Sequence, residues 1–390
     1  MTLRTAFKNI LGAGKRTWLI VFVLSFTMVI MVGFNGLIDG WVEESKIESV
    51  NWQMGDGQFW HPQYDRYDIF SLQDAHGKYP EELAPYVENK SITPILLTQA
   101  TIYPQGRMQN VILNGIDMEQ SVLEIPSSLL KNDDQTDIPV IIGERMANAA
   151  DLKEGDRVML RWRDKNGAFD AKEVIVAGIF TNKVPATDAG QIWLNIHDLY
   201  EMTGMSNEAT YFVKSQECPL EQDAGEWIFR DLDYLLADIN EMEQSANVES
   251  AIVFILLLSI SLLAVFDTQT LSIFRRQKEI GTYIALGMTP KKVIGLFTLE
   301  GTCYSILAVF AGIIWGTPLL ILFQKYGFSI PESTQDMGVV MGDAMYPAYH
   351  LSSITISILI IIVLSAIISY IPTRKIAKQN VVHALKGKVQ

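Results

Sequence analysis

The sequence is poor in the residues that crosslink or catalyse. Its 390 residues include only two cysteines, Cys218 and Cys303, which excludes a fold held together mainly by disulfide bonds. The histidines are scattered, without the i, i+4 pair of a helical zinc site, and no Gly-x-Ser-x-Gly motif is present. They are His61, His76, His197, His350 and His383. We therefore expect neither a zinc site nor a hydrolase site, and no enzymatic activity in this chain.

A nucleotide-binding motif is missing as well. GAGK at residues 12–15 is similar to part of a P-loop, but a P-loop requires Gly-x-x-x-x-Gly-Lys-Ser/Thr. Asn9 stands where the first glycine is needed, and Arg16 stands where the hydroxyl residue is needed. We therefore expect this chain itself to bind neither ATP nor another cofactor.

Charge is absent, or nearly so, from four long stretches of the chain. Thr17–Ile38, Gly301–Gln324 and Leu351–Thr373 contain no charged residue, and Ser250–Phe274 contains only Asp267. Each stretch reaches the roughly 20 residues that a helix needs to cross a bilayer. None has the polar face of a surface helix in a soluble protein. We predict four transmembrane helices, of which the first is too long for a signal peptide and remains as an anchor.

The charges that are present are distributed unevenly. Residues 1–16, 275–292 and 374–390 together hold 14 lysines and arginines and one acid, Glu279. Residues 39–249 hold 38 acids and 16 bases. Because basic flanks stay in the cytoplasm, both termini and the 275–292 loop are predicted to be cytoplasmic and the acidic segment external. The net charge of −13 is the sum of these two compartments and gives no indication of nucleic-acid binding.

These features divide the chain into eight segments. We predict an N-terminal amphipathic helix and first span over 1–38, an external domain over 39–248, a second span over 249–274, a short cytoplasmic helix within 275–292, a third span over 293–325, a short outer loop over 326–350, a fourth span over 351–373 and a basic tail over 374–390.

The external domain is predicted to be mixed α/β. Four segments are rich in β-branched and aromatic residues and are typical of strands: 98–104, 107–117, 156–163 and 171–180. The sequence DKNG at 164–167 predicts a tight hairpin between the last two. Residues 226–258 have a helical period, so we expect one continuous helix to run from the domain into the second span.

The inner loop, RRQKEIGTYIALGMTPKK at 275–292, has the pattern of a short amphipathic helix. An apolar stripe falls at i, i+3, i+4 and i+7 and consists of Ile280, Tyr283, Ile284 and Gly287. Gly287 suits a helix C-terminus, and the Thr-Pro pair at 289–290 suits the start of the next helix. Pattern alone is compatible with a linker that lies on anionic lipid and with a helix that docks on a protein.

Residues 275–301 resemble the signature of the FtsX/MacB-type ABC permease superfamily, in which an Arg-x-x-Glu-Ile-Gly run precedes Ala-Leu-Gly. The matching positions are Arg276, Glu279, Ile280, Gly281, Ala285, Leu286, Gly287, Glu300 and Gly301. Three further blocks are similar to parts of the same family: LRTAFKNILGAGKRTWL before the first span, IIGERMANAADLKEGDRVMLRW in its periplasmic core domain, and SYIPTRKIAKQNVVHALKGK in its C-terminal tail.

This resemblance implies an α-helical membrane protein with four transmembrane helices and a mixed α/β, MacB-like periplasmic domain. It also implies that the inner helix docks on a separate ABC ATPase, present in two copies, which carries ATP and Mg. The docking residues would be Arg275, Arg276, Glu279, Ile280, Gly281, Tyr283, Ile284, Leu286 and Gly287. The apolar stripe would fill a groove of the ATPase, and the charged residues would set the register at its rim. A second permease chain and membrane lipid are the other expected partners, and no nucleic acid is expected.

Within the superfamily, the lipoprotein-releasing branch is the most similar, because it has four spans, a large external domain and a separate ATPase. It implies extraction of lipoproteins or another lipid-anchored cargo from the inner membrane of a Gram-negative cell. The short hairpin at 164–169 leaves little room for the hook that recruits a carrier in that branch, so a periplasmic carrier and the choice of homodimer or heterodimer stay open. The alternatives are a mechanotransmission scaffold that regulates a periplasmic partner and a tripartite efflux permease.

Two acids in or near the spans need an explanation. Asp267 precedes Arg275 by eight residues, about 12 Å along a helix, and a carboxylate at that depth must face protein or water. We expect an inter-helix hydrogen bond there, with a substrate or proton role as the alternative. Glu300 follows Lys291 and Lys292 closely, and we expect it to be a helix-start carboxylate near those lysines.

Three glycines lie at helical intervals near the outer end of the first span. They are Gly33, Gly36 and Gly40. Small residues in a membrane helix let another segment approach closely, so we predict close packing at this face. A lateral gate for a lipid-linked substrate is a further hypothesis for the same face.

Overall fold

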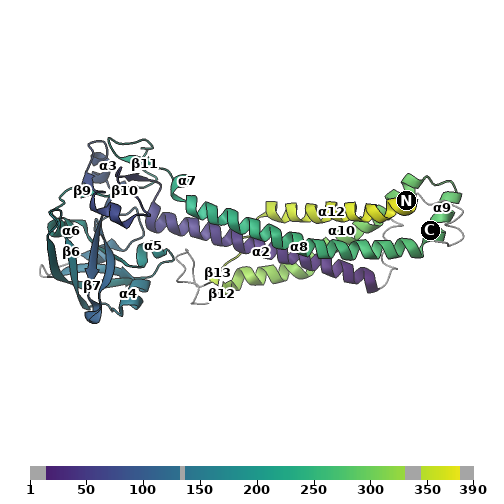
Figure 1. Cartoon of the computed structure of the whole chain (residues 1–390), viewed down its shortest axis with the longest axis horizontal. Coiled ribbons are helices and arrows are strands. Elements are labelled where there is room, and N and C mark those ends of the chain that lie inside the picture. Colours follow the sequence, from purple (N-terminus) through teal and green to yellow (C-terminus); the bar gives the residue numbers. More distant parts are fainter. Residues whose placement is uncertain (1–14, 132–136, 330–343, 378–390) are drawn as a thin grey trace. The chain divides into compact units, whose positions relative to one another are not determined.

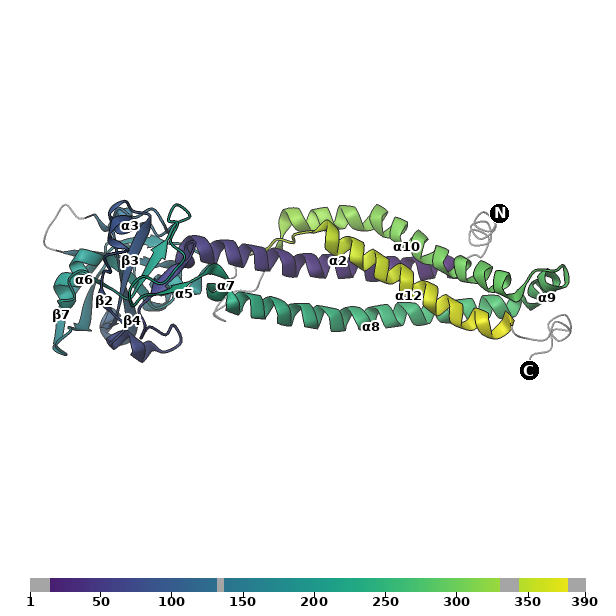
Figure 2. The ribbon, with the colours of Figure 1, turned by 90° about the horizontal axis from the view of Figure 1, so that it is seen from above.

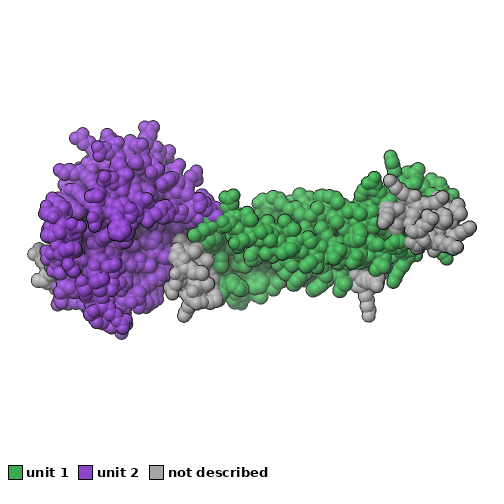
Figure 3. All heavy atoms as spheres, in the orientation of Figure 1, with its two compact units in different colours: residues 1–42, 242–329, 344–390 green, residues 43–241, 330–343 purple. Residues whose placement is uncertain are grey.

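The computed structural model describes residues 15–131, 137–329 and 344–377. Most of the predicted N-terminal amphipathic helix, much of the predicted outer loop and most of the basic tail lie outside these residues. The chain consists of two compact units (Figure 3). The helical unit comprises residues 1–42, 242–329 and 344–390, and the α/β unit comprises residues 43–241 and 330–343.

The helical unit contains four long helices that lie alongside one another (Figures 1 and 2). They are α2 (Lys15–Ser49), α8 (Ala237–Arg275), α10 (Pro290–Tyr326) and α12 (Leu351–Ala377). Each is long and apolar enough to cross a membrane, and each contains one of the four predicted spans. A fifth helix, α9 (Gln277–Ala285), connects α8 to α10, and a two-stranded ribbon of β12 (Phe328–Ser329) and β13 (Ala344–Met345) precedes α12.

The packing of these helices is inverted relative to a soluble bundle. The buried face of α12 carries small polar residues, and its exposed face carries large apolar ones. The former are Ser357, Ser365, Ser369 and Thr373, and the latter include Ile356, Leu359, Val363 and Ile367. Small residues let membrane helices approach closely, while lipid solvates the large apolar side chains. The helical unit therefore has the side-chain distribution of a membrane protein.

The long helix before the second span is confirmed only in part. α8 runs without a break from Ala237 to Arg275, as predicted for that region. The prediction was wrong for residues 226–236, where Ile228–Arg230 form strand β11 and Leu232–Leu235 form the short helix α7. β11 pairs with another strand of the α/β unit, so the pairing available in the folded domain overrides the helical period of this segment.

A closed ring of six strands forms the core of the α/β unit. In order around the ring, the strands are β3 (Ile92–Ile102), β4 (Gln109–Ile116), β8 (Gln191–Asn195), β5 (Ile138–Gly143), β7 (Phe169–Phe180) and β6 (Arg157–Arg163). The ring closes because β6 pairs with β3 as well as with β7. All four predicted strands and the hairpin at 164–167 are confirmed.

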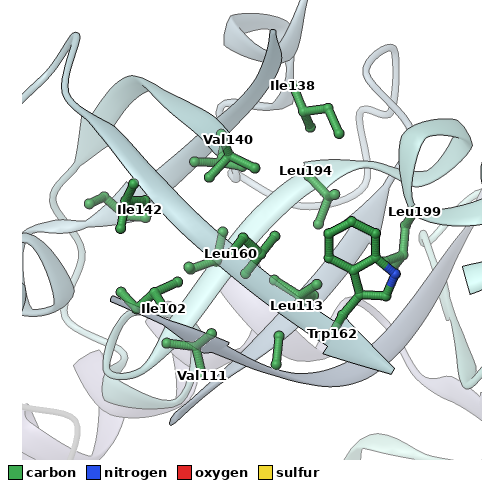
Figure 4. Close-up of a cluster of buried hydrophobic side chains, with 14 of the residues drawn as sticks. Ile102, Val111, Leu113, Ile138, Val140, Ile142, Leu160, Trp162, Leu194 and Leu199 are labelled. Atoms are coloured by element: carbon green, nitrogen blue, oxygen red, sulfur yellow. The ribbon is translucent and has the colours of Figure 1, made fainter. Parts of the chain in front are cut away.

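Side chains that point into this ring fill it. Along β6, Val158, Leu160 and Trp162 are buried while the residues between them are exposed, as the two-residue period of a strand requires. Leu113 and Leu194 meet Leu160 and Trp162 in the middle of the cluster (Figure 4). The ring is therefore a packed core and not a channel.

The remaining elements extend or cover the ring. β10 (Tyr211–Lys214), β1 (Gln58–Trp60) and β11 continue the sheet outward from β3. The helices are α3 (Ala84–Glu88), α4 (Glu144–Ala150), α5 (Pro185–Asp188) and α6 (Ile196–Thr203), and β2 (Gly77–Lys78) pairs with β9 (Glu208–Ala209).

One buried carboxylate holds α4 in place. Asp188 accepts hydrogen bonds from the backbone N–H groups of Arg145 and Met146 in the first turn of α4 and from the Arg145 guanidinium, at 2.9 Å. A Cβ at Gly143 would lie 1.9 Å from the Asp188 carboxylate, so only glycine fits before α4. Burial raises the pKa of Asp188, while these donors act to lower it.

Candidate functional site

Helix α9 lies at the end of the helical unit where α8 and α10 meet (Figure 1). It terminates in a Schellman motif, in which Gly287 donates to the Ile284 carbonyl and Met288 donates to the Tyr283 carbonyl, both at 3.0 Å. Gly287 has a φ of +92°, a conformation that costs glycine little. The predicted glycine terminus is therefore confirmed, and Pro290 begins α10 as predicted.

The apolar stripe of α9 packs against its own chain. Ile280 is 3% exposed and lies in a cluster with Ile273 of α8 and with Val293 and Phe297 of α10. Tyr283 and Ile284 pack partly against the same cluster, and Gly281 is buried beside it. The nearby ends of α8 and α10 therefore cover Ile280 and part of Tyr283 and Ile284, while Gly287, the last residue of the stripe, is exposed.

A different face of α9 is exposed. It consists of Lys278, Glu279, Thr282, Ala285 and Leu286, which we call the outer face of α9. Leu286 is 81% exposed, which is unusual for a leucine outside a lipid-facing surface. Arg275, at the end of α8, is exposed as well. The predicted docking residues are thus divided between a covered group and an accessible group.

Arg276 belongs to the covered group. Its Nε donates to Glu279 at 2.7 Å, and its Nη1 donates to both carboxylate oxygens of Glu300, at 3.0 and 2.9 Å. Its guanidinium also lies over the Phe297 ring, 4.9 Å from the centroid. Burial alone would lower the pKa of Arg276, but the hydrogen bonds and charges of Glu279 and Glu300 raise it overall. Arg276 therefore stays charged, and it is not at the rim of an open surface.

Glu300 is likewise not a surface carboxylate beside lysines. It is 3% exposed, and it accepts hydrogen bonds from Arg276, which precedes it by 24 residues. The next residue explains how α10 comes close to its neighbours. A Cβ at Gly301 would lie 2.1 Å from Ser369 Oγ of α12 and 2.7 Å from Gln269 Nε2 of α8. Glu300 thus forms a salt bridge with Arg276. Gly301 lies where α8, α10 and α12 come into contact.

The expectation for Asp267 was wrong. Its side chain is exposed on α8 and makes no hydrogen bond to the residues that the structure describes. The buried polar residue of this region is Gln269, in line with Val265 and Ile273 on the inner face of α8. Two residues correspond to about 200° of helix rotation, which places Asp267 on the opposite face.

The close packing predicted for the glycines of α2 is confirmed, with a partner that the sequence did not reveal. A Cβ at Gly36 would lie 2.5 Å from the Tyr349 ring, and one at Gly40 would lie 2.0 Å from the Tyr346 carbonyl. The Ala348 N–H donates to the Gly36 carbonyl at 2.8 Å. The segment that leads into α12 therefore lies across these glycines, while Gly33 faces Leu320 at 3.3 Å.

Two cavities of the described residues differ greatly in size. One, between α2 and the start of α12, is about 10 Å³ and includes Asn35 and Ser353 in its lining. The other is an open cleft of about 800 Å³ in the α/β unit, bordered by Phe70, Phe169 and Arg161. None of the predicted site residues lies in this cleft. Within the described ranges, no three His, Cys, Asp or Glu residues are grouped closely enough to hold a metal ion.

The fold and this site define a class: a helical membrane protein in which a short, half-exposed helix joins two spans. Residues 251–381, which include α9, α10 and α12, match the family model described as FtsX-like permease C-terminal. This match covers the C-terminal third of the chain and agrees with the resemblance of residues 275–301 to the FtsX/MacB-type permease superfamily.

Two other comparisons add little. The chain is similar to the crystal structure of the extracellular domain of the noncanonic ABC-type transporter YknZ from Gram-positive bacteria, at 14% identity. The match covers 47% of this chain and 94% of that one, with a TM-score of 0.26. No curated protein matches the sequence.

Proposed function

We propose that this chain is the membrane subunit of an ATP-driven transporter, in which a separate ATPase docks on the outer face of α9. The observation that carries the proposal is the division of α9 into two faces. One face is packed on α8 and α10 through Ile280, and the other presents Leu286 and charged neighbours at the surface. A helix bound on one side by its own spans is suited to receive movement from a partner on the other side.

The docking can be tested with one matched pair of variants. Leu286→Gln removes the most exposed apolar side chain of the outer face, whereas Lys292→Gln introduces the same side chain on the exposed first turn of α10. If Leu286 anchors the ATPase, its loss lowers the binding free energy by about 2 kcal/mol, which is roughly a thirtyfold lower affinity. Less ATPase should then co-purify with the variant. Lys292→Gln should co-purify like the wild type. Equal recovery of the ATPase by both variants would contradict docking on the outer face.

We further propose that the protein lies in the inner membrane of a Gram-negative cell, with both termini in the cytoplasm and the α/β unit in the periplasm. The support is the concentration of basic residues at 1–16, 275–292 and 374–390. A membrane-impermeant thiol reagent applied to the periplasmic side should label Lys165→Cys and not Lys291→Cys, since both positions are exposed. Labelling of residue 291 alone would reverse the topology.

The cargo that fits best is a lipid-anchored protein, most simply a lipoprotein. The support is the resemblance of the chain to the lipoprotein-releasing branch, which has four spans, a large external domain and a separate ATPase. The test is a vesicle assay with the chain, its co-purified ATPase and a membrane-anchored lipoprotein. ATP-dependent release of the lipoprotein supports extraction. Hydrolysis without release favours a mechanotransmission scaffold.

A further inference from the structure

The contact between Arg276 and Glu300 differs from the other charged contacts near α9. The guanidinium reaches both carboxylate oxygens through one nitrogen, and the side chains are 18% and 4% exposed. Glu279, the other partner of Arg276, is 54% exposed and lies one turn away on the same helix. The pair with Glu300 is therefore the buried charged link between α9 and α10.

A buried ion pair resists separation more than an apolar contact does. If one partner moves away, the other is left as an unpaired charge in a region of low dielectric. Apolar contacts, in contrast, are not directional and allow side chains to slide past one another. The contact of Ile280 with Ile273 of α8 is of this second kind, whereas α9 is joined to α10 by both kinds.

The backbone also connects α9 differently to α8 and to α10. Arg276, between α8 and α9, has φ −102° and ψ +17°, outside the helical range, so the two helices are connected by a bend. On the other side, the Schellman motif at Gly287 and the start of α10 at Pro290 fix the connection within a few residues. The direction of the chain therefore changes at Arg276, between α8 and α9.

We propose that the Arg276–Glu300 ion pair makes α9 and the first turns of α10 one rigid body, which rotates about the bend at the end of α8. Arg276 is then a positioning residue that transmits movement, and it is not part of the ATPase-binding surface. This inference rests on the proposed function, since it names the route by which a load on α9 enters the membrane helices.

Rigidity is measured by the distance between two spin labels. Thr282→Cys on α9 and Gly295→Cys on α10 are both exposed, and a side chain at Gly295 meets open space. Because Thr282 lies on the outer face of α9, the labelled chain is first shown to retain its ATPase. The buried Cys218 and Cys303 are replaced by alanine in this background. In nanodiscs containing the full chain and its co-purified ATPase, we expect the 282–295 distance to stay constant when a non-hydrolysable ATP analogue and Mg are added. A pair of labels at Leu263 on α8 and at 295 should change its distance.

The link is then broken in two ways. Glu300→Gln leaves Arg276 without its buried countercharge, and we expect a lower melting temperature as well as a broadened 282–295 distance distribution. Arg276→Met combined with Glu300→Met removes both charges, so the melting temperature should recover while the distribution stays broad. In both variants the ATPase should co-purify normally, whereas the change that the analogue causes in the 263–295 distance should be lost.

Lys292→Gln, at an exposed position on the first turn of α10, is the control and should behave as the wild type in every measurement. A wild-type 282–295 distance that changes with nucleotide would overturn the proposal, as would a narrow distribution in the double variant. Loss of ATPase binding in Glu300→Gln alone would assign the pair to docking and would also overturn it. Failure of the wild type to bind an ATPase would instead refute the proposed function, and the distance distributions without nucleotide would still test the rigid link.

Discussion

Replacing Gly301 by alanine should destabilise the helical unit through one identifiable contact. The added Cβ would lie 2.1 Å from Ser369 Oγ, 2.4 Å from Ser369 Cβ and 2.7 Å from Gln269 Nε2. Both neighbours are buried, at 0% and 2% exposure, so neither can turn toward solvent. Overpacking of this kind costs about 1–3 kcal/mol.

Gly295 provides the matched control on the same helix. It is exposed, and no atom lies within 4 Å of the Cβ that alanine would add. Both substitutions gain the same helix propensity, about 1 kcal/mol, so the difference between the two variants isolates the contact at Gly301. We expect Gly301→Ala to unfold at a temperature roughly 2–12 °C below Gly295→Ala.

The assay is thermal unfolding of the full chain in detergent, followed by loss of the monodisperse peak in size-exclusion chromatography. Adding Ser369→Gly to Gly301→Ala removes the two closest atoms and should restore part of the lost stability. If the two alanine variants unfold at the same temperature, α10 does not approach α12 as closely as the structure shows, and the explanation of Gly301 by packing is refuted.

Two further substitutions test the structure away from α9 and its contacts. Asp188→Ala should lower the free energy of unfolding by about 3–5 kcal/mol, because it leaves Arg145 and the first turn of α4 without their buried acceptor. Chemical unfolding monitored by tryptophan fluorescence measures this loss. A loss below about 1 kcal/mol would argue against the role of Asp188. Gly40→Ala should lower the melting temperature more than Gly33→Ala does, because its Cβ meets the Tyr346 carbonyl at 2.0 Å and not a movable side chain; equal effects would contradict the contact across α2.

The membrane helices could be predicted because the requirement that lipid imposes is coarse. A run of uncharged residues of sufficient length is enough, and the chain contains four. Strands β6 and β7 were predictable for a related reason, since their β-branched and aromatic content suits a half-buried surface. The helix prediction was wrong for residues 226–236 because a helical period describes one segment by itself. β11, in contrast, forms because it pairs with β1, which lies far away in the sequence.

The site was predictable in position but not in orientation. Periodicity shows that α9 has an apolar face, and it cannot show whether that face meets a partner or the chain itself. Ile280 meets Ile273, Val293 and Phe297, three residues whose position depends on how α8 and α10 come together. In the same way, the single charge in the second span suggested a role for Asp267, whereas the phase of the helix places Gln269 inside.

The pairing of Arg276 with Glu300 was not predicted from the sequence either. Both residues match the family signature, but a separation of 24 positions gives no indication that they touch. One signal was available: Glu300 is an acid surrounded by the uncharged residues of a predicted span, where an unpaired carboxylate is costly. A search for its counterion among the basic residues of the preceding loop would have included Arg276.

The double pairing of β6 has a consequence for how the α/β unit behaves among other proteins. A sheet with open borders offers unpaired N–H and C=O groups to any extended chain nearby, and such borders promote aggregation. Here the six-stranded ring has no border of its own, and the outermost strand of its extension, β11, is three residues long. The α/β unit therefore leaves little backbone available for unintended strand exchange with other chains.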